Sequence, residues 1–160
     1  MIRIVRARAP LRLGLFGGGT DVSPYCDDFG GVVINSTIDK YAYVTIKESE
    51  DKLIIFNAED LNIKEEFSLD DLKKSNNKLK LHKTIYLYMI EKYNKNNFIP
   101  LTINSYCEVP PGSGLGSSTT LVVTIIKAFV EYFKLGLDDY QIAKLTFYFE
   151  RTICKISGGK

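Results

Sequence analysis

The sequence contains no tryptophan, one histidine and only three cysteines. Cys26, Cys107 and Cys154 lie far apart along the chain, and no two cysteines have Cys-x-x-Cys spacing. An odd number of widely spaced cysteines argues against a disulfide framework and against a zinc site, and it fits a reducing compartment. We therefore expect a cytoplasmic protein whose thiols are buried or incidental.

Long apolar runs and an excess of one charge are also missing. No apolar run reaches the roughly 18 residues that a membrane span needs, and residues 1–6 lack the apolar core of a signal peptide. Lysine and arginine number 21 against 19 aspartates and glutamates, which gives a formal net charge of +2. This balance gives no electrostatic reason to expect a nucleic acid or an anionic membrane as partner. At 160 residues, the chain is long enough for one domain with a real core.

The apolar pattern predicts an α+β domain. Alternating or β-branched stretches predict strands at residues 2–7, 11–16, 32–38, 41–46, 53–56, 63–67 and 101–106. Pro10 is expected to separate the first two strands, and Asp39-Lys40 is expected to form a turn. Short polar links join the strands between residues 32 and 67, which suggests an antiparallel meander.

Helical spacing and capping residues predict the helices. Helices are expected to begin at Ser68, near Leu81, at Leu121 and at Asp138. The third should end at Gly136, and the fourth, which Asp138 and Gln141 open as a capping box, should reach about Arg151. His82 lies in the second helix without an accompanying acid or nucleophile, so a structural role is expected for it.

A glycine-rich loop between the strand at 101–106 and the helix at 121–135 is the strongest functional signal. Glycines stand at positions 112, 114 and 116, and Ser117 and Ser118 follow them. The first turn of a helix has N–H groups without internal partners, and the helix dipole adds about half a positive charge there. Glycines without Cβ atoms allow a phosphate to approach that backbone. The loop therefore predicts a phosphate cradle, in which Ser117 and Ser118 cap the helix or bind a metal ion.

The loop has other possible interpretations. A flexible turn with a good helix cap has the same composition. The loop lacks the lysine of a Walker A motif, and no acidic residue follows at the place where a dinucleotide-binding fold has one. Both of those nucleotide sites are therefore disfavoured.

Two stretches of the chain resemble a known family. Residues 110–118 read Pro-x-x-x-Gly-Leu-Gly-Ser-Ser and resemble the ATP-binding motif of the GHMP small-molecule kinases. Residues 9–21 read Ala-Pro-x-Arg-x-x-Leu-x-Gly-Gly-Gly-Thr-Asp and resemble the first motif of the same family in its sugar-kinase form. The Gly-Gly-Gly-Thr-Asp end is similar to the branch that contains heptose 7-phosphate kinases and fucokinases.

The resemblance implies a fold, a reaction and a set of site residues. The fold is the α+β N-terminal domain of a GHMP kinase over residues 1–160, a fold similar to a ribosomal protein domain. The implied reaction uses ATP and Mg²⁺ to phosphorylate the anomeric hydroxyl of a sugar phosphate, with D-glycero-D-manno-heptose 7-phosphate giving the 1,7-bisphosphate. Arg12 would stabilise charge on the transferred phosphoryl group, and Ser118 and Glu150 would bind Mg²⁺. The sugar would bind to Gly17, Gly18, Gly19, Thr20 and Asp21. ATP would bind to Pro111, Gly112, Ser113, Gly114, Leu115, Gly116, Ser117 and Ser118.

The end of the chain is similar to a region of that branch which precedes the catalytic base. Glu150-Arg151 and Gly158-Gly159-Lys160 carry this likeness. It predicts an N-terminal portion that lacks the base and the C-terminal ferredoxin-like domain and is inactive alone. Fucokinase-like or other sugar kinase activity, a non-catalytic sugar or nucleotide sensor, and a nucleic-acid-binding module remain alternatives. No oligomeric state is indicated.

Overall fold

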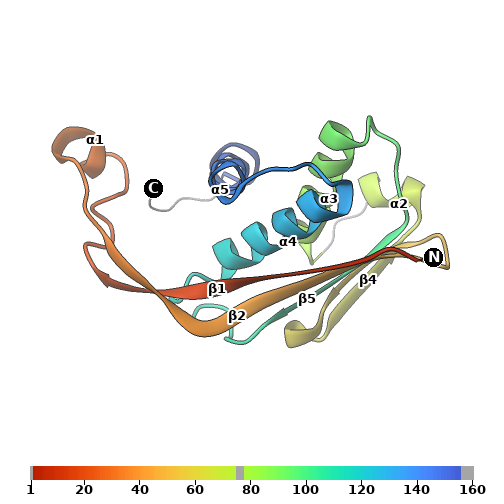
Figure 1. Cartoon of the computed structure of the whole chain (residues 1–160), viewed down its shortest axis with the longest axis horizontal. Coiled ribbons are helices and arrows are strands. Elements are labelled where there is room, and N and C mark those ends of the chain that lie inside the picture. Colours follow the sequence, from red (N-terminus) through yellow and green to blue (C-terminus); the bar gives the residue numbers. More distant parts are fainter. Residues whose placement is uncertain (1, 75–77, 156–160) are drawn as a thin grey trace.

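A five-stranded sheet carries helices α2 to α5 on one of its faces (Figure 1). The computed structural model describes residues 2–74 and 78–155. The sheet order is β1-β2-β5-β3-β4, so the predicted α+β class is confirmed. The strands are β1 (Ile4–Phe16), β2 (Ile34–Glu48), β3 (Ile54–Ala58), β4 (Ile63–Phe67) and β5 (Leu101–Cys107). The helices are α1 (Tyr25–Phe29), α2 (Leu69–Lys74), α3 (Lys80–Tyr93), α4 (Ser117–Phe133) and α5 (Asp139–Tyr148), with a 3₁₀ turn η1 (Glu59–Leu61) and a π-helical turn η2 (Phe149–Ile153).

The strand pairing is not the predicted antiparallel meander. β5 lies between β2 and β3, and it pairs antiparallel with β2 and parallel with β3. Five of the seven β5 residues are buried, a pattern that suits a central strand covered by neighbours. The prediction was wrong because short links show only which strands are close in sequence. They do not show that a later strand, β5, inserts between β2 and β3.

Two predicted breaks lie inside continuous strands. Pro10 is part of β1, which is an edge strand. An edge strand tolerates proline because it has no second neighbouring strand that needs the missing N–H. Asp39 and Lys40 lie within β2, and the register shifts between Pro10 and Arg12. The extra β2 residues at this irregularity make the paired strands bend. Beyond it the β1–β2 ribbon turns toward the helical side of the sheet and leads to α1 (Figure 1).

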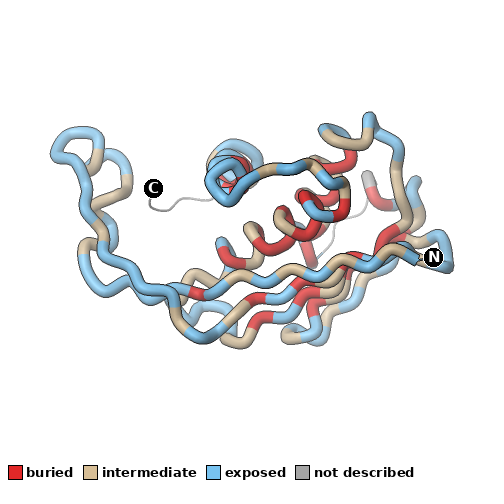
Figure 2. Tube along the Cα trace, in the orientation of Figure 1, coloured by how far each residue is buried: buried red, intermediate tan, exposed pale blue. Residues whose placement is uncertain are grey.

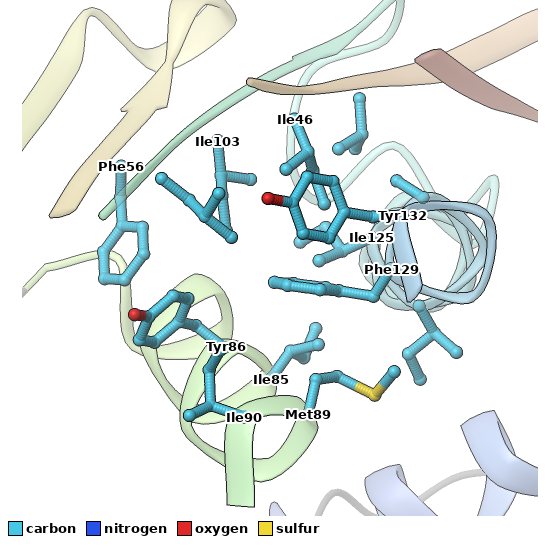
Figure 3. Close-up of a cluster of buried hydrophobic side chains, with 14 of the residues drawn as sticks. Ile46, Phe56, Ile85, Tyr86, Met89, Ile90, Ile103, Ile125, Phe129 and Tyr132 are labelled. Carbon is cyan, nitrogen blue, oxygen red and sulfur yellow. The ribbon is translucent and has the colours of Figure 1, made fainter. Parts of the chain in front are cut away.

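The hydrophobic core fills the space between the sheet and helices α3 and α4. Buried segments of both helices face the sheet in Figure 2, and Figure 3 shows Ile46 and Ile103 of the sheet directed toward Phe129 of α4 and Tyr86 of α3. Burial of one such large apolar side chain stabilises the fold by about 1.5–3 kcal/mol. α4 is apolar on most sides because it contacts both the sheet and the helices α3 and α5.

The ends of the helices confirm some of the sequence predictions and correct others. Asp138 and Gln141 form the predicted capping box at the start of α5. The Ser68 hydroxyl accepts the N–H of Asp71 at 3.2 Å before α2. α4 ends at Phe133 with Lys134 in the left-handed conformation (φ 53°) as its cap, so the prediction of Gly136 as the cap was wrong.

The basic residues near the N-terminus are distributed over different surfaces. These residues are Arg3, Arg6 and Arg8. The Arg3 Nη2 donates to the Glu131 carbonyl at 3.2 Å, near the C-terminal end of α4, where a positive charge is favourable. Arg6 is exposed in β1 opposite Thr45. Because α4 has 17 residues and is therefore about 25 Å long, Arg3 lies far from the glycine-rich loop at its other end.

His82 is a core residue. It is 2% exposed, its Nε2 lies 2.8 Å from the Ser105 hydroxyl, and its ring lies near that of Phe56. Burial lowers the pKa of His82 to about 4, although the nearby Glu65 carboxylate acts in the opposite direction. The structural role expected from the sequence is confirmed.

We predict that His82 makes the protein less stable in mild acid. Between its ordinary pKa of about 6.5 and its folded pKa of about 4, the unfolded chain binds a proton that the folded chain does not. The free energy of unfolding therefore falls as the pH drops through this window, by about 2 kcal/mol between pH ~7.5 and pH ~5 from this residue. Urea unfolding of the wild type and of His82→Gln at both pH values measures the effect. An identical pH dependence in the two proteins would contradict it.

Candidate active site

The glycine-rich loop ends at an uncapped helix start. Gly112, Gly114 and Gly116 all have positive φ, at 81°, 75° and 73°, a conformation that glycine adopts without steric cost. Gly116 is the N-cap of α4, and no side chain caps this end. The helix begins at Ser117, so the prediction that Ser117 or Ser118 caps it was wrong. The first-turn N–H groups are consequently left for a ligand or solvent.

The loop is fixed to the sheet by one apolar side chain and one backbone hydrogen bond. Leu115 packs against a small cluster formed by Leu11, Ala42 and Cys107. The Arg12 N–H donates to the Leu115 carbonyl at 3.2 Å. Both contacts come from β1 and its neighbours, so the backbone on either side of Leu115 is held at the edge of the sheet.

Arg12 lies directly beside the start of α4. A Cβ atom added to Gly116 would lie 3.5 Å from both Cγ and Nε of Arg12. The Arg12 Nη1 donates to the Asn35 Oδ1 at 2.9 Å. The structure thus brings together two predicted site residues, Arg12 and Gly116, that are far apart in sequence. A guanidinium beside free helix N–H groups forms a surface suited to an anion.

Asn35 was not among the residues predicted for this site. The only available signal was a polar residue in the predicted strand at 32–38. Its pairing with β1 depends on the register shift next to Arg12, and hydrophobic periodicity does not reveal such a shift.

The triple-glycine turn is partly a structural device. A Cβ on Gly17 would lie 1.9 Å from the Val32 carbonyl oxygen, and one on Gly31 would lie 2.2 Å from the Thr20 carbonyl oxygen. The Thr20 hydroxyl donates to the Gly17 carbonyl at 2.7 Å and accepts the Val32 N–H at 3.2 Å. The Thr20 hydroxyl therefore holds the turn close to the segment at residues 31–32. The spacing leaves no room for a side chain at position 17 or 31.

The fold itself does not account for the glycine at position 18. A Cβ on Gly18 or Gly19 would meet nothing within 4 Å, and Gly18 does not have positive φ. Asp21 is half-buried, and among the described residues its carboxylate has no hydrogen-bond or ion-pair partner. Gly18 and Gly19 are exposed, and Asp21 follows them two residues later. Their assignment to sugar binding stays a prediction.

Glu150 is a buried carboxylate with an unused oxygen. It lies in η2 and is 6% exposed, and its Oε1 has no hydrogen-bond partner. The Thr146 hydroxyl, one turn earlier, is also buried and also has no hydrogen-bond partner. An unpartnered buried polar atom is costly, and carboxylate oxygen is a ligand that Mg²⁺ prefers. The donor chemistry of Glu150 therefore fits a magnesium ion.

The predicted magnesium pair of Glu150 with Ser118 remains a prediction. α4 and α5 pack together, but Ser118 is exposed at the start of α4. Among the described residues, no hydrogen bond joins Ser118 to the Glu150 Oε1. In residues 2–74 and 78–155, no group of three or more His, Cys, Asp or Glu side chains is arranged to hold a metal ion. Phosphate oxygens would have to supply further ligands. Gly158 to Lys160, part of the likeness noted above, lies outside the described residues.

Two surface hollows lie away from this site. One, of about 520 Å³, is on the sheet face opposite the helices and is lined by residues that include Ile4, Lys47 and Thr102. The other, of about 440 Å³, lies beside β1 and α4 and includes Arg6 and Lys127. Neither includes a residue of the glycine-rich loop or of the triple-glycine turn. Residues 111–114 of the loop are exposed, so the predicted phosphate-binding surface is open to solvent.

Comparison with known proteins finds a matching family model and similar kinases. Residues 80–160 match the family model described as GHMP kinases N terminal domain. The chain is 42% identical over 158 residues to a D-glycero-alpha-D-manno-heptose 7-phosphate kinase of Campylobacter jejuni, covering 99% of this chain and 46% of that protein. It is 32% identical over 144 residues to a galactokinase of Thermosipho africanus, covering 89% of this chain and 37% of the galactokinase.

A solved structure supports the fold over the whole chain. The crystal structure of a D-glycero-D-manno-heptose 1-phosphate kinase from Bacteroides thetaiotaomicron matches with a TM-score of 0.81 and 39% identity, covering 100% of this chain and 51% of that one. The chain spans about half the length, or less, of the relatives it matches. Within the described residues, no helix has both the length and the apolar character needed to cross a bilayer.

We predict effects of very different size for alanine at two neighbouring glycines. Gly17→Ala should lower the free energy of unfolding by at least about 2 kcal/mol, because the new methyl group overlaps the Val32 carbonyl and the residue has positive φ. Gly18→Ala should change it by less than about 0.5 kcal/mol, because its methyl group meets nothing. Urea unfolding of both variants measures the difference. Equal destabilisation by the two changes would contradict this description of the turn.

Proposed function

Because the chain belongs to the GHMP kinase family, we propose that it forms the ATP-binding part of a sugar kinase that phosphorylates D-glycero-D-manno-heptose 7-phosphate. The observation that carries the proposal is the position of the Arg12 side chain against Gly116, at the uncapped start of α4. This arrangement joins the residue predicted to stabilise the transferred phosphoryl group with the loop predicted to bind ATP.

The proposed reaction is transfer of the γ-phosphoryl group of ATP to the anomeric hydroxyl. The hydroxyl oxygen forms a bond to the γ-phosphorus while the bond from that phosphorus to the bridging oxygen of ADP breaks. The hydroxyl proton leaves to a base, for which we propose a residue beyond the first 160. Catalysis of this kind depends mainly on positioning and on stabilisation of charge. The loop N–H groups would bind the phosphates, and Arg12 would stabilise charge on the transferred group.

Magnesium would neutralise charge on the phosphates when it is bound. Glu150 and Ser118 are the residues proposed to hold it, with phosphate oxygens as the other ligands. The buried and unpartnered Oε1 of Glu150 supports this assignment.

The choice of substrate rests on the first motif and on the relatives. The Gly17–Asp21 turn presents open backbone at Gly18 and Gly19 and a free carboxylate at Asp21. A carboxylate accepts hydrogen bonds from sugar hydroxyls. The relative named as a heptose 7-phosphate kinase is 42% identical, against 32% for the galactokinase.

We further propose that a second domain, the ferredoxin-like one predicted from the sequence, completes the site in the whole protein. The relatives are about twice as long as this chain or longer. The arm formed by residues 13–34 exposes large apolar side chains, among them Phe16 at 73%, Phe29 at 75% and Val32 at 77%. Grouped apolar side chains on a surface mark a site of contact with another polypeptide surface.

We predict that Arg12→Ala lowers kcat of the complete gene product by about 100-fold or more, with Mg·ATP and heptose 7-phosphate as substrates. The loss should fall mainly on kcat because the guanidinium acts on charge that develops during transfer. Arg6→Ala is the matched control, since Arg6 is exposed on another part of β1. An unchanged kcat in Arg12→Ala would remove Arg12 from the reaction, and phosphorylation of other sugars alone would overturn the proposed substrate.

We predict that Glu150→Gln raises the Mg²⁺ concentration for half-maximal activity by about tenfold or more. The substitution keeps the shape of the buried side chain and removes the charge that attracts the cation. Thr119→Ala, in the first turn of α4 but outside the proposed magnesium pair, is the control. Activity measured over a Mg²⁺ titration gives the result, and a curve identical to the wild type would show that Glu150 does not bind the ion.

A further inference from the structure

We propose that Asn35 is a positioning residue for Arg12. Its neutral amide oxygen holds the guanidinium at the start of α4 without cancelling the positive charge. The inference rests on the proposed function, in which Arg12 stabilises the transferred phosphoryl group.

In the contact between the two residues, donor and acceptor can be assigned in only one way. The Arg12 Nη1 donates to the Asn35 Oδ1 at 2.9 Å. A guanidinium has only donors, so the amide must present its oxygen rather than its nitrogen. A Cβ on Gly14, which pairs with Asn35 across the strands, would lie 3.7 Å from the same oxygen. The amide therefore has room to lie flat along the strand toward Arg12.

Two contacts fix the long Arg12 side chain at different points. Its Cγ and Nε lie beside Gly116, and its terminal nitrogen is bound by Asn35. An exposed arginine is otherwise free to adopt many rotamers. The pair of contacts selects one of them before any ligand binds, and such pre-organisation reduces the entropy lost when the charged end meets an anion.

The register shift of β2 places a neutral residue at this point. Pro10 pairs with Tyr41, and continuing that register would put Arg12 opposite Asp39. The shift instead puts Arg12 opposite Thr37, with Asn35 two residues along the same face of β2. Arg12 forms no ion pair with another described residue. Its charge is therefore directed to whatever anion binds at the loop.

A carboxylate in place of the amide would keep the hydrogen bond and remove this property. An Asp–Arg pair neutralises the guanidinium and reduces its attraction for a phosphoryl group. If Asn35 had a purely structural role, Asn35→Asp would be the more active variant, because aspartate has nearly the shape of asparagine and alanine does not. The order of activity between the two variants therefore distinguishes the roles.

The experiment measures kcat and KM of the complete gene product with Mg·ATP and heptose 7-phosphate. We expect Asn35→Asp to lower kcat by about 100-fold and Asn35→Ala by about tenfold. In an Arg12→Ala background, Asn35→Asp should have little further effect, because it acts through Arg12. Ser36→Asp adds the same charge at the neighbouring position, where the side chain points to the other face of the strand, and it should leave kcat nearly unchanged. Thermal unfolding of each variant shows that it is folded.

The outcomes separate this inference from the function on which it rests. Activity of Asn35→Asp equal to or above that of Asn35→Ala would overturn the positioning role, as would an equal loss from Asn35→Asp in the Arg12→Ala background. A wild-type protein that phosphorylates no sugar, or an Arg12→Ala variant as active as the wild type, would overturn the proposed function instead.

Discussion

The attachment of the glycine-rich loop to β1 is the constraint on which the site depends. Leu115 packs into the cluster of Leu11, Ala42 and Cys107, and its carbonyl accepts the Arg12 N–H. One short segment of β1 thus fixes the backbone that ends at Gly116 and also supplies the guanidinium beside it. Because both the loop and the charge are fixed by the same residues, the start of α4 and Arg12 cannot move independently. Such coupling is what a site for charge stabilisation requires.

The triple-glycine turn divides into structural and open positions. Gly17 and Thr20 hold the turn against the segment at Gly31 and Val32. Gly18 is not required by the backbone or by its neighbours. A glycine that the fold does not need is therefore the better candidate for contact with a substrate, and the sequence motif alone does not make this distinction.

Some local signals in the sequence predicted local structure correctly, although both predicted caps of α4 were wrong. The Asp138–Gln141 capping box and the helices from residues 69 and 80 were found where composition and spacing indicated them. The long-range features were missed because they depend on which strands pair. The place of β5 between β2 and β3, and the continuation of β1 through Pro10, follow from the packing of the whole sheet. Asn35 was missed for the same reason, since the β2 register decides its position.

The most direct measurement is a crystal structure of the complete gene product with a non-hydrolysable ATP analogue. The triphosphate is expected at the N–H groups that follow Gly116, with a phosphate oxygen within hydrogen-bond distance of the Arg12 guanidinium. An analogue bound instead in the hollow lined by Lys47 and Thr102, or in the one beside Lys127, with the start of α4 free of phosphate, would contradict it.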